Sequence, residues 1–129
     1  LFELRKDGVA VVTTCAGENE VSDAELVVSL KTMLEIESVD ELILVLRDPI
    51  LASELKEFRF DPRRKLLEQS LDKLATDFYT RFRILALNPS NGSDEYAPVS
   101  IEMAFNIGAT FASRKSLVFV DCSRQIRSL

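Results

Sequence analysis

The sequence has no histidine among its 129 residues. This absence excludes Ser-His-Asp and Cys-His catalytic schemes and any zinc site with histidine ligands. An enzyme built from this chain must therefore use carboxylates, hydroxyls, lysine, tyrosine, cysteine or backbone groups. Cysteine is also scarce, and Cys15 and Cys122 stand far apart in no metal-binding spacing. We expect no metal site, and we expect two reduced thiols that pack as small apolar residues in a cytosolic protein.

Long apolar runs and glycine-rich phosphate motifs are missing as well. No apolar run approaches the roughly 18 residues that a membrane-spanning helix needs, and the start shows no signal-peptide pattern. The sequence contains no GxGxxG and no GKS or GKT, so it has neither a Rossmann fingerprint nor a P-loop. We therefore expect a cytoplasmic protein without a membrane partner.

Positive charge is in the minority. The net charge is −5, which argues against non-specific nucleic-acid binding. The one basic cluster, residues 63–65, opens a predicted helix and is interpreted as a solvated face. Hydrophobic residues make up 47% of the chain and charged residues 29%, a balance typical of a folded domain.

The order of predicted elements defines the fold class. β-branched and apolar runs predict strands at Val9–Thr14, Glu41–Leu46, Arg83–Leu87 and Ser116–Cys122. Capping signals and 3.6-residue periodicity predict helices at 22–38, 49–58 and 61–82, and a last helix with Pro98 in its first turn. Strands that alternate with helices predict an α/β fold with a parallel sheet of about four to five strands and helices on both faces. We expect one domain, 1–129, cut from a longer protein because the sequence begins at Leu1.

The last predicted helix carries two stripes. Small and apolar residues recur at helical spacing and predict a core-facing stripe, which comprises Ile101, Ala104, Phe105, Gly108, Ala109 and Ala112. A polar stripe beside it comprises Glu102, Asn106, Thr110 and Ser113. On spacing alone, Glu102 is a solvated acid near a helix start, where the helix dipole favours negative charge.

Loops at the carboxyl ends of the strands are the expected place for a ligand. Asp94 and Glu95 lie in such a loop, and Glu102 follows at the same edge. These carboxylates either divide acid and base roles in a cleft or keep the surface soluble. Thr13 and Thr14 end the first predicted strand, where their hydroxyls either bind a ligand or cap a loop.

The segment from Ile84 to Asp121 resembles the last third of the TIR-like and nucleoside 2-deoxyribosyltransferase-like group. Bacterial TIR-like members have a pattern N-V-x-x-E-[LM]-G-x-x-I-G before a basic residue and a strand. Glu102-Met103 and Ile107-Gly108 match this pattern at the right spacing, and Arg114 precedes the strand. Ala104 replaces a glycine of the pattern, and Pro98 replaces its asparagine.

The resemblance implies a flavodoxin-like three-layer sandwich that cleaves the N-glycosidic bond of a nucleotide such as NAD. Glu102 would be the catalytic carboxylate, and Thr14, Asn88 and Asp94 would bind substrate. No cofactor is implied. The alternative is a non-catalytic module that senses a nucleotide or self-assembles as a homo-oligomer to control a fused effector. A receiver-like domain fits least, because the third predicted strand ends at Asn88 rather than at aspartate.

Overall fold

The computed structural model describes residues 5–15, 22–47, 65–87 and 100–122. Four strands are present in this part of the chain: β1 (Lys6–Cys15), β2 (Glu41–Leu46), β3 (Phe82–Ala86) and β4 (Arg114–Asp121). The helices are α1 (Asp23–Leu34), α3 (Lys65–Asp77) and α4 (Ile101–Phe111). The helix expected at 49–58 lies outside the described residues.

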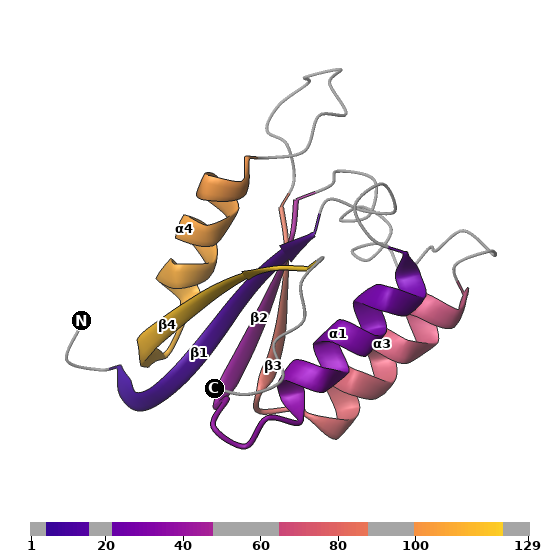
Figure 1. Cartoon of the computed structure of the whole chain (residues 1–129), viewed down its shortest axis with the longest axis horizontal. Helices are drawn as coiled ribbons and strands as arrows, with labels where there is room; N and C mark the ends of the chain where they lie inside the picture. Colours follow the sequence, from indigo (N-terminus) through magenta and orange to yellow (C-terminus); the bar gives the residue numbers. More distant parts are fainter. Residues whose placement is uncertain (1–4, 16–21, 48–64, 88–99, 123–129) are drawn as a thin grey trace.

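The strands form one parallel sheet with helices on both faces (Figure 1). α1 and α3 pack side by side on one face, whereas α4 packs on the other face over β1 and β2. The α/β class, the parallel sheet and the three-layer sandwich expected from the sequence are therefore confirmed, and these layers are compatible with a flavodoxin-like sandwich. No helix in the described ranges is long and apolar enough to cross a membrane.

The strand order within these layers is β3-β2-β1-β4. This order matches the first four strands of the classic doubly wound sheet, 3-2-1-4-5-6, whereas flavodoxin itself has the order 2-1-3-4-5. The helices α1 and α3, which precede β3 in the sequence, lie on one face of the sheet, and α4, which precedes β4, lies on the other face. The reversal of direction occurs between β1 and β4, which are neighbours in the sheet.

The central strands explain why the sheet is covered on both faces. Residues of β1 from Ala10 to Cys15 and all of β2 are buried. Alternate residues face opposite layers, so Val11 and Leu44 join the core under α1 and α3. Val12 and Val45 join the core under α4. The predicted bounds of β2 are confirmed, while β1 begins earlier than predicted, at Lys6.

α4 begins three residues later than Pro98. Ser100 is the N-cap with an extended backbone, and its hydroxyl accepts a hydrogen bond from the Met103 N–H at 3.2 Å. The prediction that Pro98 lies in the first turn is therefore wrong. The helix begins after Ser100 because its side chain can accept a hydrogen bond from the first turn, which a proline side chain cannot do. Most of the predicted core stripe is confirmed, with Ala104 and Gly108 buried, although Ile101 stays 36% exposed.

Polar side chains close the amino-terminal edge of the sheet. Glu41 is 5% exposed, and its carboxylate accepts hydrogen bonds from the Ser113 N–H at 2.9 Å and the Ser113 hydroxyl at 3.0 Å. Arg83 lies 3.5 Å from the same carboxylate and donates to the Phe111 carbonyl at 2.8 Å. These contacts fix the carboxyl end of α4 to the start of β2 and β3, so α4 has a defined position on the sheet.

Candidate functional site

The carboxyl edge of the sheet is where the described strands end together. Backbone hydrogen bonds extend the ladder slightly beyond the strands, from Arg47 N–H to Cys15 O at 3.1 Å and from Leu87 N–H to Leu46 O at 3.0 Å. Across the β1–β4 pair, Cys122 N–H donates to Thr14 O at 3.3 Å. The ends of β1, β2 and β4 are thus held in register at this edge.

Two capped helix N-termini point to the same edge (Figure 1). The Ser22 hydroxyl accepts from the Glu25 N–H at 3.2 Å to cap α1, as the capping-box prediction required. Ser100 caps α4 in the same way. The N-terminus of a helix carries a partial positive charge, so this edge offers two such ends on opposite faces of the sheet.

Glu102 lies in the first turn of α4 and is exposed. It belongs to the polar stripe with Asn106 and Thr110, both of which are also exposed, as predicted. Within the described residues its carboxylate makes no hydrogen bond or ion pair. Glu102 is therefore accessible to a ligand at the carboxyl edge, but the described residues form no enclosing wall around it.

Thr14 is 1% exposed, and its hydroxyl donates to the Val45 carbonyl at 2.9 Å. The hydroxyl hydrogen is thus engaged inside the sheet. Thr13 points to the other face and is fully buried, and its hydroxyl has no hydrogen-bond partner within the described residues. Asn88 and Asp94, the other residues expected to bind substrate, lie outside the described residues.

Arg47 follows β2 directly and begins one of the loops at the carboxyl ends of the strands, but its residue type alone did not single it out. It is only 7% exposed, and its backbone N–H bonds to the Cys15 carbonyl, so a buried arginine begins at the carboxyl edge beside the end of β1. Arginine is well suited to bind a phosphate or carboxylate because its donors match those groups in pairs. Its signal in the sequence was only the apolar strand that precedes it.

The two cysteines, far apart in the sequence, become neighbours in space. Thr14 lies opposite Asp121 in the β1–β4 register, and the next residues are Cys15 and Cys122. Both are buried in the core under α1, and neither is in a disulfide, so the expected packing as small apolar residues is confirmed. No group of three or more cysteine, aspartate or glutamate residues in the described ranges could hold a metal ion.

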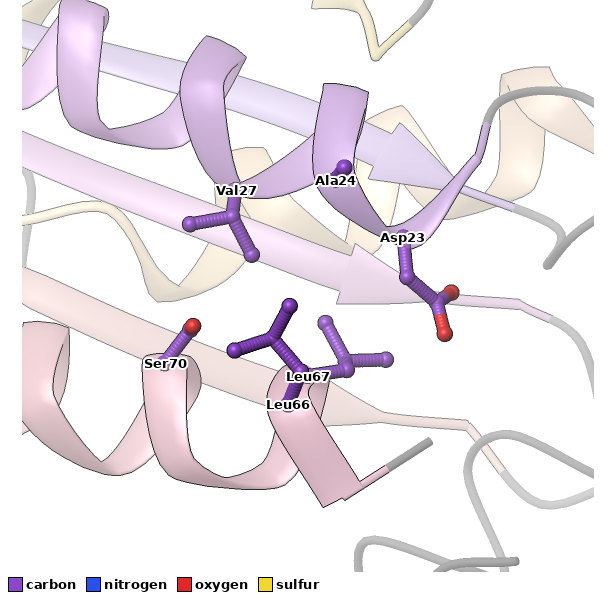
Figure 2. Close-up of a pocket in the computed structure, with 6 residues that line it drawn as sticks. All are labelled: Asp23, Ala24, Val27, Leu66, Leu67 and Ser70. Carbon is purple, nitrogen blue, oxygen red and sulfur yellow. The ribbon is translucent and has the colours of Figure 1, made fainter. Parts of the chain in front are cut away.

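A cavity of about 180 Å³ opens between the first turns of α1 and α3 (Figure 2). Its lining is mainly apolar and comprises Asp23, Ala24, Val27, Leu66, Leu67 and Ser70. Small-molecule sites usually occupy at least about 300 Å³, so this cavity is too small for a nucleotide. It lies on the face of the sheet opposite α4, and it includes none of the site residues expected from the sequence.

Comparison of the chain with protein-family models, curated proteins and solved structures finds no match. The class is therefore defined by architecture: a doubly wound α/β domain whose reversal point lies between β1 and β4.

Proposed function

We propose that this domain binds a nucleotide at the carboxyl edge of its sheet, outside the ends of β1 and β4. The observation that carries this proposal is the strand order β3-β2-β1-β4. In open parallel sheets, ligands bind in the crevice where the strand order reverses, because the loops on either side of that point diverge to opposite faces.

The chemistry of the edge supports an anionic ligand. Arg47 contributes a buried positive charge beside the end of β1, and α1 and α4 both begin there. A phosphate group can bind a guanidinium and helix N-termini together. The edge therefore suits a phosphate-bearing ligand better than it suits a neutral metabolite.

Cleavage of the ligand is the second candidate function, and the position of Glu102 favours it. Glu102 lies in the first turn of α4 at the same edge, and it is the glutamate of the Glu-Met pair that, together with Ile107-Gly108, resembles the pattern of TIR-like N-glycosidases. A carboxylate there could stabilise an oxocarbenium-like transition state. Two features favour binding without cleavage: Glu102 is exposed, and β3 and β4 lie at opposite edges of the sheet. In the flavodoxin-like order, successive strands at these positions would be neighbours.

Thermal unfolding with a panel of NAD, ATP, AMP and adenosine tests binding, and chromatography of the same mixtures tests cleavage. We expect the phosphate-bearing nucleotides to raise the melting temperature, since a ligand at about 100 times its Kd stabilises the folded state by about 2.7 kcal/mol. Adenosine, which lacks phosphate, should raise it least. If no nucleotide changes the melting temperature, the binding proposal is wrong.

Glu102→Gln separates the two functions. If the domain cleaves, this variant should lose release of nicotinamide or free base while its melting temperature stays within about 1 °C of the wild type, as expected for an exposed site. Glu25→Gln is the matched control, because it removes an exposed carboxylate from the first turn of α1 on the other face. A Glu102→Gln variant with full turnover would exclude Glu102 as the catalytic residue.

A further inference from the structure

Cys15 and Cys122 are facing residues at the carboxyl ends of β1 and β4. Thr14 pairs with Asp121 in the parallel register, and the Cys122 N–H donates to the Thr14 carbonyl at 3.3 Å. In a parallel ladder, a residue whose N–H bonds to position i−1 of the neighbouring strand lies opposite position i. Cys122 therefore lies opposite Cys15, one step beyond the last pair of the β1–β4 ladder.

The two cysteine side chains point to the same face of the sheet. Alternate residues of β1 and β4 face the layer of α1 and α3, where Val11 and Val120 join the core. Cys15 and Cys122 join the same core, and each is 1% exposed. Two cysteines on adjacent strands thus share one face and one register position.

The spacing of neighbouring strands suits a disulfide between these cysteines. Adjacent strands of a sheet lie about 4.7–4.9 Å apart, so the Cα atoms of facing residues are separated by roughly that distance. Disulfides join Cα atoms that are about 4.4–6.8 Å apart when the side chains point the same way. The two sulfur atoms can therefore bond with little displacement of the backbone.

We propose that Cys15 and Cys122 are a redox-sensitive pair that forms an intramolecular disulfide across the reversal point of the sheet, with a small-molecule disulfide such as oxidised glutathione as the oxidant. One cysteine thiolate attacks oxidised glutathione, which forms a mixed disulfide and releases one glutathione thiol. The second cysteine thiolate attacks the protein sulfur of the mixed disulfide and releases the second glutathione thiol. The two protons of the protein thiols end on the two glutathione thiols. The bond depends only on the β1–β4 register, so it forms whether or not the domain binds a nucleotide.

Burial of the two cysteines favours this bond over other products of oxidation. A buried thiol cannot reach a thiol of a second molecule while the fold is intact, and a lasting glutathione adduct would need space for a tripeptide in the packed core under α1. The first exchange requires local opening at the strand ends. The last hydrogen bond there is 3.3 Å long, beyond the usual range of about 2.7–3.2 Å for N–H···O bonds, so this end of the ladder opens most readily.

Thiol trapping on the folded chain tests the proposal. The protein is equilibrated with mixtures of reduced and oxidised glutathione, its remaining thiols are alkylated in denaturant after an acid quench, and its intact mass is measured. We expect both thiols to be lost together as the oxidised fraction rises, with loss of the mass of two hydrogen atoms and without a covalent dimer. The bond closes a loop of more than about 100 residues, so oxidation should raise the melting temperature by about 10 °C, and dithiothreitol should reverse the increase.

Moving one cysteine by two positions tests the register directly. Val120→Cys combined with Cys122→Ala keeps a second cysteine on the same buried face, but the rise of two residues sets its Cα about 8 Å from that of Cys15, beyond the limit of about 7 Å. This variant should keep both thiols in a glutathione mixture that oxidises the wild type. A wild type that keeps both thiols at the highest oxidised fraction, or that ends as a glutathione adduct or a covalent dimer, would overturn the proposal. Oxidation of the shifted pair as readily as the wild type, or a lower melting temperature after oxidation, would also overturn it.

Discussion

The contact between α4 and the sheet depends on Gly108. A β-carbon built on this residue would overlap the Val12 Cγ1 methyl and lie 3.2 Å from Val45 Cγ2. Both valines are fully buried in the two central strands. Gly108→Ala must therefore displace either the helix or a packed valine, and displacement of α4 would also move Glu102.

The change in the free energy of unfolding for Gly108→Ala follows from two opposing effects. Alanine in place of glycine inside a helix gains about 1 kcal/mol of propensity. Overpacking of a well-filled core costs about 1–3 kcal/mol, and the overlap with a methyl group on a central strand favours the upper part of that range. We expect Gly108→Ala to lower the free energy of unfolding by about 1–2 kcal/mol and the melting temperature by about 5 °C.

Urea denaturation followed by far-UV circular dichroism measures this effect. Asn106→Ala, an exposed substitution on the same helix, is the control and should change stability by less than about 0.5 kcal/mol. In a Val12→Ala background the overlapping methyl is absent, so Gly108→Ala should be neutral or stabilising there. If Gly108→Ala alone is as stable as the wild type, the inferred close approach of α4 is wrong.

Two further predictions concern buried polar groups. Thr13→Val should leave the free energy of unfolding unchanged or raise it by about 1 kcal/mol, because it removes a buried hydroxyl that has no partner within the described residues. Thr14→Val should lower the free energy of unfolding by about 1 kcal/mol, because it removes the hydrogen bond to Val45 O. Equal effects of the two substitutions in chemical denaturation would contradict this distinction. Glu41→Ala should lower the free energy of unfolding by about 2–3 kcal/mol, because it leaves the Ser113 N–H and hydroxyl without their carboxylate acceptor. A loss under about 0.5 kcal/mol would show that the hydrogen bonds at the amino-terminal edge of the sheet contribute little.

Local patterns predicted the elements well where burial is one-sided or complete. The continuous apolar run of β2 predicted its first and last residues correctly, and the spacing of Leu67, Leu71 and Leu74 identified the buried face of α3. The small residues of α4 indicated a close approach to the sheet, and Gly108 makes that approach. In each case the pattern depends only on which side of the element is buried, and not on which other element covers it.

The order of the strands in the sheet could not be predicted from such local patterns. Strand and helix alternation leaves the neighbours of each strand undetermined, because any strand with two apolar faces fits any interior position. The nearness of Cys15 to Cys122 depends on the β1–β4 pairing and was therefore equally hidden.

The candidate site was predicted only in part. The carboxyl edge followed from the general geometry of parallel sheets, and Glu102 lies there in α4 as expected. The burial of Arg47 depends on neighbouring elements rather than on its own sequence context. The engaged hydroxyl of Thr14 likewise depends on β2, since a threonine at a strand end bonds to whichever carbonyl the neighbouring strand provides.

The most direct test of the account is an NMR titration of the 15N-labelled protein with AMP, which carries one phosphate, one ribose and one base. Binding at the reversal point predicts that amide shifts concentrate at the carboxyl edge, at Cys15, Arg47, Cys122 and the first turn of α4. Amides at the amino-terminal edge, such as those of Glu41 and Ser113, should stay unchanged. Shifts confined to the amino-terminal edge or to the cavity between α1 and α3, or no shifts at all, would contradict a nucleotide site outside β1 and β4.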